Sequence, residues 1–215
     1  MMIARGGLSW VVTVLILMIV AFLTSFLTSG YVRWVALFFS GVLFLLWCLL
    51  LIFFRDPERM IGSGVIAVAD GKIREITQER DPEVGDCTKI STFMNIHNVH
   101  VNRMPLEGTI EMVTHHPGRH LPAFQKESEN NERVVLLIHT KIGPMKVIQI
   151  AGTIARRIVP YVTKGDHLNK GEKLGLIRLG SRVDIYLPTK KIKTLSIQVH
   201  DNVRAGVDTI AEIND

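Results

Sequence analysis

The dipeptide Gly180-Ser181 places a serine hydroxyl directly after a residue that has no side chain. It lies between two strand-like runs, LGLIRL at 174–179 and RVDIYL at 182–187. Because glycine lacks a Cβ, its backbone can adopt a strained turn and its carbonyl is open to attack by the neighbouring hydroxyl. Such an attack would exchange the amide for an ester, and elimination of that ester would then cut the chain between residues 180 and 181. A Gly-Ser pair is equally typical of an ordinary bulge or turn, so the dipeptide alone leaves both interpretations open.

Histidines are the side chains that could activate this hydroxyl, because a serine is a poor nucleophile without an adjacent base. The segment HNVHVNR at 97–103 contains two of the eight histidines. In an alternating strand His100 would share a face with Asn98 and Asn102, which makes a polar stripe that needs partners if it is buried. His100 is therefore the candidate base, with His97 as its alternative. An exposed polar strand face is the other interpretation.

Two further groups of polar residues require an interpretation. Asp70, in the segment VADG at 68–71, is by its spacing typical of a hairpin turn. His115, His116 and His120 lie close together, but they have no convincing fourth ligand for a metal ion. We therefore expect no metal site, and we expect the histidine-rich segment to form a flexible loop near the substrate.

Charge is distributed very unevenly along the 215 residues. Residues 1–54 contain no acidic side chain and two basic ones, Arg5 and Arg33, so residues 55–215 carry a formal charge of 23 − 20 = +3. This small excess favours the surface of an anionic membrane and argues against a nucleic-acid partner. The two cysteines, Cys48 and Cys87, offer neither a disulfide framework nor a cysteine-based zinc site.

Two long apolar runs, at 8–27 and 34–54, are each long enough as a helix to cross about 30 Å of hydrocarbon. The six residues between them allow only a tight hairpin. Positive charge flanks the outer ends of the pair, which places both ends in the cytoplasm by the positive-inside rule. The sequence thus predicts a membrane hairpin over residues 1–54 and a domain over residues 55–215.

The pattern after residue 60 consists of short β-branched runs separated by glycine, proline and Asp-Gly pairs. Such runs predict strands, and the short connections predict antiparallel pairing. A 3.6-residue period is present only near 122–130. We expect a mainly β domain, an antiparallel sheet or a barrel-like sandwich, with at most one or two short helices.

A resemblance to a known family covers nearly everything after the membrane segments. The segment GDHLNKGEKLGLIRLGSRVDIYLP at 165–188 resembles the cleavage region of the phosphatidylserine decarboxylase proenzymes, in their short bacterial and archaeal form. Other segments agree in order: FFRDPER at 53–59, VADGKI at 68–73, FMNIHNVHVNRMPLEGTI at 93–110, HHPGRHLPAF at 115–124, NNER at 130–133 and IQIAGTIARRIVPYV at 148–162.

The resemblance implies a site and a reaction. It implies self-cleavage between Gly180 and Ser181, with Ser181 becoming a covalent pyruvoyl group, His100 acting as base and Asp70 orienting that histidine. The mature enzyme would be a heterodimer of residues 1–180 and 181–215. It would convert phosphatidylserine to phosphatidylethanolamine and CO₂ through a Schiff base, at the cell (inner) membrane with the catalytic domain on the cytoplasmic side, without an external cofactor.

Some features depart from the longer family members, and alternatives remain. Arg103 stands where those members have a second histidine, Asn98 where they have an aspartate, and Arg182 where a threonine follows the serine. The same chemistry on archaetidylserine, an ether lipid, is one alternative. The other is a non-catalytic membrane-anchored domain of the biotinyl or lipoyl kind, with Lys146 as attachment site, although that lysine precedes the paired turns and leaves Ser181 without a role.

Overall fold

The computed structural model describes residues 2–119, 130–152, 158–178 and 181–214. The chain divides into two compact units, Met1–Pro57 and Glu58–Asp215, which are treated separately below. Gly180 and His120 lie outside the described residues. The helical period expected near 122–130 also lies outside them, apart from residue 130.

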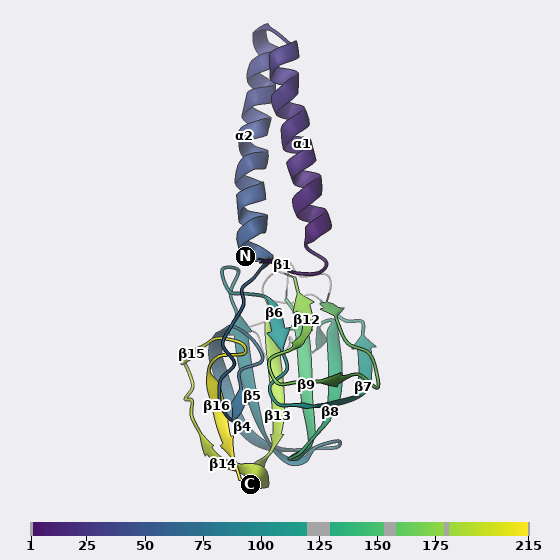
Figure 1. The fold of residues 1–215 in the computed structure, drawn as a ribbon, viewed down its shortest axis with the longest axis vertical. Helices are drawn as coiled ribbons and strands as arrows, with labels where there is room; N and C mark the ends of the chain where they lie inside the picture. The colour runs from purple at the N-terminus through teal and green to yellow at the C-terminus, as the bar shows by residue number, and fades with distance from the viewer. Residues whose placement is uncertain (1, 120–129, 153–157, 179–180, 215) are drawn as a thin grey trace. The chain divides into compact units, whose positions relative to one another are not determined.

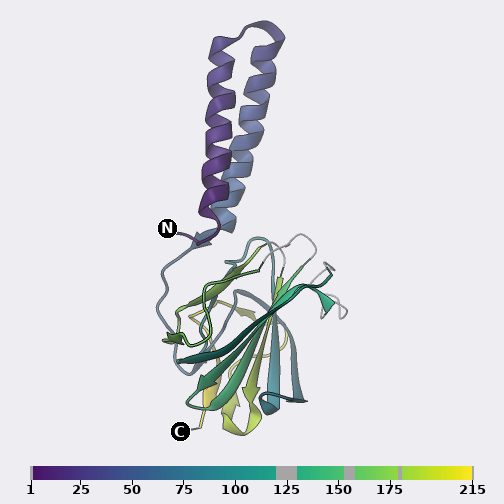
Figure 2. The ribbon, with the colours of Figure 1, turned by 90° about the vertical axis from the view of Figure 1, so that its right-hand side faces the viewer.

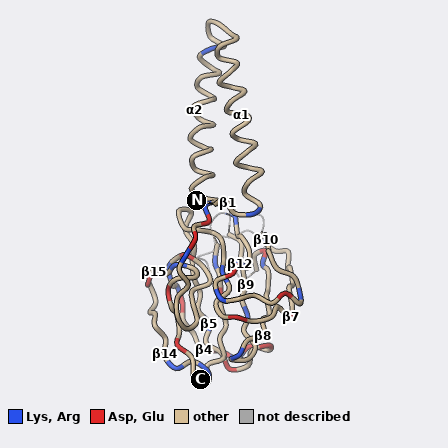
Figure 3. Tube along the Cα trace, viewed as in Figure 1, with Lys and Arg blue, Asp and Glu red and all other residues tan. Residues whose placement is uncertain are grey.

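The first unit is a hairpin of two helices. Helix α1 spans Leu8–Leu27 and helix α2 spans Gly30–Phe53, and short strands β1 (Met2–Ile3) and β2 (Arg55–Asp56) pair with each other. Both helices are long and apolar enough to cross a membrane. Figure 3 shows them almost free of charged residues. The first helix has the expected bounds, and the second begins four residues earlier than expected because Ser29 is still extended and Gly30 opens the helix.

The second unit is mainly β, as predicted, and most of its strands belong to one antiparallel sheet of eight (Figure 1). In spatial order the strands are β11 (His167–Leu168), β7 (Gly108–His116), β8 (Arg133–Thr140), β9 (Gly143–Ala151), β13 (Ser181–Pro188), β5 (Gly85–Met94), β4 (Gly71–Asp81) and β15 (Asn202–Val203). Figure 2 shows these strands fanning out, as the right-handed twist of a large sheet requires.

Two three-stranded antiparallel sheets complete the domain. One has the order β10 (Ile158–Pro160), β12 (Lys173–Ile177) and β6 (Val101–Arg103), and the other has the order β14 (Ile192–Leu195), β16 (Thr209–Ile213) and β3 (Val65–Ile66). A single 3₁₀ turn, η2 (Thr189–Lys191), connects β13 to β14. The hydrophobic core combines side chains of the large sheet, such as Leu136 and Ile185, with Leu174 and Ile210 from the smaller ones.

Strand β13 occupies the middle of the large sheet and is buried on both faces. Its odd-numbered side chains Val183, Ile185 and Leu187 belong to the main core, which defines the inner face of the sheet. On the outer face, Arg182 donates a hydrogen bond to Asp184 over 2.9 Å. Burial raises the pKa of the Asp184 carboxyl, although the charge of Arg182 opposes that effect. The strand that begins with Ser181 is therefore fixed from both sides.

Candidate active site

Ser181 is the first residue of β13, and its side chain is fully buried on the inner face of the large sheet. In register it lies between Met94 of β5 and Ala151 of β9. Its hydroxyl donates to the thioether sulfur of Met94, with Oγ and Sδ 3.3 Å apart. Sulfur is a weak acceptor that does not remove the proton, so Met94 holds the hydroxyl in place and leaves it protonated.

A chain of buried amides continues from Met94 into the core. Asn102 of β6 donates from Nδ2 to the Met94 sulfur over 3.7 Å, and Gln149 of β9 donates from Nε2 to Asn102 Oδ1 over 2.7 Å. Gly175 of β12 faces this pair, where a Cβ would lie 3.0 Å from Gln149 Nε2 and 2.8 Å from the carbonyl oxygen of Val159. Glycine is thus required for β12 to approach so closely.

His100 precedes β6, and its side chain is buried. Ring atom Nδ1 lies 2.9 Å from the carbonyl oxygen of Asn98, and the backbone carbonyl of His100 accepts from the N–H of Ile177 at the end of β12. Because a carbonyl oxygen can only accept, Nδ1 carries the hydrogen in this contact and the lone pair of the neutral ring resides on Nε2. His97, its alternative in the sequence, is exposed.

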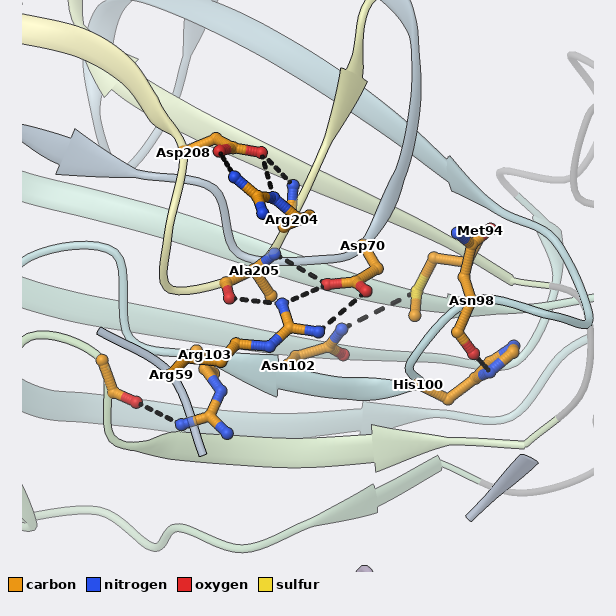
Figure 4. A network of polar contacts seen from close by, with 11 residues as sticks. Arg59, Asp70, Met94, Asn98, His100, Asn102, Arg103, Arg204, Ala205 and Asp208 are labelled. Carbon is orange, nitrogen blue, oxygen red and sulfur yellow. Dashed lines mark hydrogen bonds and ion pairs between the residues drawn. The ribbon is translucent and has the colours of Figure 1, made fainter. Parts of the chain in front are cut away.

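Asp70 contacts a different partner from the one that the sequence analysis expects. Its two carboxylate oxygens accept from both terminal nitrogens of Arg59, over 2.5 and 2.9 Å, and Oδ1 also accepts from the backbone N–H of Ala205 over 2.8 Å. In Figure 4 the carboxylate points toward Arg59 and Ala205, and the His100 ring points toward Asn98. The Asn98 carbonyl, from two residues upstream, supplies the ring contact that was expected from Asp70.

The Arg59–Asp70 pair should matter for stability, because the two side chains are 8% and 10% exposed. We expect Asp70→Asn to lower the free energy of unfolding by about 3–5 kcal/mol, since it leaves a buried guanidinium without its counter-ion. Chemical unfolding of the full chain in detergent measures this loss, with the β-sheet signal in far-UV circular dichroism as the readout. The more accessible pair Arg204–Asp208, with side chains 66% and 30% exposed, is the matched control, and Asp208→Asn should shift the unfolding midpoint far less. Equal shifts for the two variants would contradict the proposed contribution of the Arg59–Asp70 pair to stability.

The two arginines that depart from the longer family members lie away from the Ser181 hydroxyl. Arg182 follows the serine and therefore projects from the opposite face of the sheet, where it pairs with Asp184. Arg103 donates from Nη1 to the carbonyl oxygen of Gly171 over 3.1 Å, and its side chain packs where a Cβ on Gly206 would be. Both arginines therefore make contacts that organise the surrounding strands.

The histidine-rich segment contributes a contact that the sequence analysis did not identify. His115 of β7 lies with Nε2 3.0 Å from the carboxylate of Glu132, the residue immediately before β8. Among the described residues, no group of three or more histidine, cysteine or acidic side chains is arranged to hold a metal ion. Glu132 belongs to the NNER segment, which is the only signal in the sequence that pointed to it.

Together these residues can support chemistry at a buried serine. A nucleophile, a histidine whose Nε2 bears a lone pair, and a pair of fixed amides come from three strands, β13, β6 and β9, and the turn before β6. Position 181 is sheltered from water, which strengthens polar interactions there. Such an arrangement suits a reaction that the protein performs on its own backbone or on a small polar group.

Comparisons with known proteins agree with this interpretation. A family model described as phosphatidylserine decarboxylase matches residues 48–211. The chain is 51% identical over 159 residues to a phosphatidylserine decarboxylase proenzyme of Streptomyces avermitilis, covering 74% of this chain and 71% of the relative. It is 41% identical over 216 residues to a protein of Methanococcoides burtonii named as an archaetidylserine decarboxylase proenzyme, covering 98% and 96%. The chain therefore belongs to the phosphatidylserine decarboxylase family.

Proposed function

We propose that this protein removes the carboxyl group of phosphatidylserine as CO₂ and leaves phosphatidylethanolamine. The observation that carries the proposal is the position of Ser181 in a chain of this family. This serine is fully buried at the start of a central strand. Its hydroxyl donates to the sulfur of Met94, which leaves the hydroxyl protonated. The lipoyl-like alternative gives this serine no role. It also requires an accessible lysine, whereas Lys146 is buried and paired with Asp81 and Glu83.

Maturation begins, in this proposal, with the Ser181 hydroxyl. Oγ attacks the carbonyl carbon of Gly180 while Nε2 of His100 accepts the hydroxyl proton, and the amide bond is replaced by an ester. Elimination then releases residues 1–180 with a free carboxylate and leaves dehydroalanine at position 181. Hydrolysis of its imine form gives ammonia and the pyruvoyl group. The products are two chains, of 180 and 35 residues, that remain associated.

The residues around position 181 fit a pyruvoyl group. Such a ketone withdraws electrons from the bond to the departing carboxyl group once the substrate amine has condensed with it. Ala151 and Met94 on either side present no charge, and the buried amides of Asn102 and Gln149 can orient a polar head group. In this proposal His100 Nε2 returns a proton to the substrate carbon. Asp70, through its ion pair with Arg59, holds the segment before β4 in place.

The lipid class is the part of the proposal that an assay must decide. The archaeal relatives match along 98–99% of this chain, including the helical hairpin, whereas the more similar Streptomyces relatives match along 74%. This coverage favours archaetidylserine as the second candidate substrate. Purified full-length protein in mixed micelles should release CO₂ from phosphatidylserine, with the amine product identified by mass spectrometry. A parallel assay with the ether lipid compares kcat/KM for the two, and failure with both would refute the proposed function.

We also propose that α1 and α2 cross the membrane with both ends in the cytoplasm, which places residues 58–215 on that side. Arg5 precedes the first helix and Arg55 and Arg59 follow the second, while Arg33 stands alone near the connection. Positive residues near helix ends favour the cytoplasm. A green fluorescent protein fused to the C-terminus should fluoresce, and alkaline phosphatase at the same position should be inactive. The reverse pair of results would place the domain outside.

A further inference from the structure

One row of side chains crosses four adjacent strands on the inner face of the large sheet. Met94 of β5 lies opposite Ser181 of β13, and Ser181 lies opposite Ala151 of β9. The next residue in the row is Glu132, since Arg133 pairs with Ile150 and the N–H of Ala151 donates to the Glu132 carbonyl over 2.9 Å. Glu132 and Ser181 are thus two strands apart, about 9–10 Å at the backbone.

The side chain between them is a single methyl group, that of Ala151. The Glu132 carboxylate is directed to the inside of the domain, because Oε1 accepts from the N–H of Ile158 on strand β10, in the sheet that includes β12, over 3.5 Å. Its side chain is 11% exposed. The Glu132 carboxylate and position 181 therefore lie on the same face of the sheet, separated in the row only by the methyl group of Ala151.

His115 connects this carboxylate to solvent. Its Nε2 lies 3.0 Å from Glu132 Oε1, and its side chain is 54% exposed. A buried carboxylate hydrogen-bonded to a half-exposed imidazole is a common means of transferring a proton between an enclosed site and water. A proton taken up by Glu132 can thus leave through a ring that reaches the surface.

We propose that Glu132 binds the ammonium group of the serine head group and accepts its proton, with His115 relaying that proton to water. The proposal rests on the function proposed above. An aliphatic amine is mostly protonated at neutral pH, and only the neutral amine has the lone pair that attacks a carbonyl carbon. The proton passes from the ammonium nitrogen to a Glu132 oxygen and then to His115, and the free amine is left beside position 181.

Glu132→Gln is the decisive variant, because it keeps the size and an acceptor oxygen and removes the basicity. The matched control is Glu111→Gln, which alters a second Glu–His pair on the same β7–β8 hairpin, where Glu111 and His139 are 3.5 Å apart and both exposed. Three quantities are measured for each full-length variant: cleavage on a denaturing gel, reaction of the new carbonyl with hydroxylamine, and covalent trapping of the substrate by cyanoborohydride.

We expect Glu132→Gln to be cleaved and to react with hydroxylamine at the wild-type rate, since hydroxylamine is already unprotonated at neutral pH. Trapping of phosphatidylserine should be slower by about 10²-fold or more, the usual effect of losing a positioned base. Glu111→Gln should match wild type in all three measurements. A purely structural role for Glu132 predicts instead that hydroxylamine and phosphatidylserine adducts decline together.

Several results would overturn the proposal. Normal trapping by Glu132→Gln would remove the proton-accepting role, and loss of cleavage in that variant would assign Glu132 to maturation. If Glu132→Gln does not fold, His115→Gln tests the relay from a half-exposed position, and wild-type trapping there would contradict it. Absence of cleavage and of a hydroxylamine adduct in wild type would instead refute the proposed function itself, so the two failures are distinguishable.

Discussion

Ser181→Ala should remain a single 215-residue chain and have no decarboxylase activity, whereas the wild-type protein should yield chains of 180 and 35 residues. The methyl group retains the buried position beside Met94 and Ala151, so the fold should be preserved, but no oxygen is available to attack Gly180. Denaturing gels and intact-mass spectrometry measure the result. Because the ketone can form only after this hydroxyl has attacked Gly180, we expect the loss to be complete.

Ser181→Cys refines the same experiment, because a thiol is the better nucleophile and can make the same acyl shift. Slow, partial cleavage is expected if the space beside Met94 tolerates the larger sulfur atom. Ser91→Ala is the control, since Ser91 is a buried serine of β5 on the outer face of the sheet. The wild-type small chain should resist Edman sequencing, because a pyruvoyl group has no amine. An intact wild-type chain that still decarboxylates the lipid would contradict the mechanism.

His100→Ala should accumulate uncut precursor, with maturation slowed by about 10²–10⁴-fold, the range typical for loss of a positioned base. The physical reason is that the Asn98 carbonyl holds the hydrogen on Nδ1 and so leaves Nε2 as the proton acceptor. The measurement is the rate of precursor disappearance after a pulse of synthesis.

His97→Ala provides the comparison, because this histidine is exposed and lies three residues beyond the end of β5 and three before His100. It should mature at close to the wild-type rate. The opposite pattern, with His97→Ala blocked and His100→Ala processed, would exchange the roles of the two histidines. Asn98→Ala retains the backbone carbonyl and should therefore have little effect on maturation.

The strand-rich fold was predictable wherever apolar residues alternate. Strand β8, RVVLLIHT, buries Val134, Leu136 and Ile138 in strict alternation, and it forms where its sequence predicts. Strand β5, GDCTKISTFM, was not predicted, because its composition is small and polar. It is a strand because β4 and β13 pair with it on both sides, and that is a tertiary effect that local propensity does not contain.

The site divides in the same way. His100 and Asn102 share a polar stripe in the sequence, and the structure does bury both. The sequence did not reveal that Arg59 is the partner of Asp70. Arg59 lies in an irregular segment, and such a segment has no periodic pattern from which its position could be predicted. Glu132 comes opposite Ala151 only through the register of β8 and β9, and register between strands is set by long-range pairing.

The position of β13 has a consequence for the chain of residues 181–215 after the cleavage that we propose. Its strands are not confined to an edge: β13 is sandwiched between β5 and β9, β15 pairs with β4, and β16 pairs with β3. Each of those partners belongs to the other fragment. Separating the fragments would therefore require breaking the large sheet in its middle and the sheet of β14, β16 and β3 at its β16–β3 pairing, and dissociation would be the same event as denaturation. The cut changes covalent connectivity while the tertiary contacts continue to hold the new terminus against its neighbours.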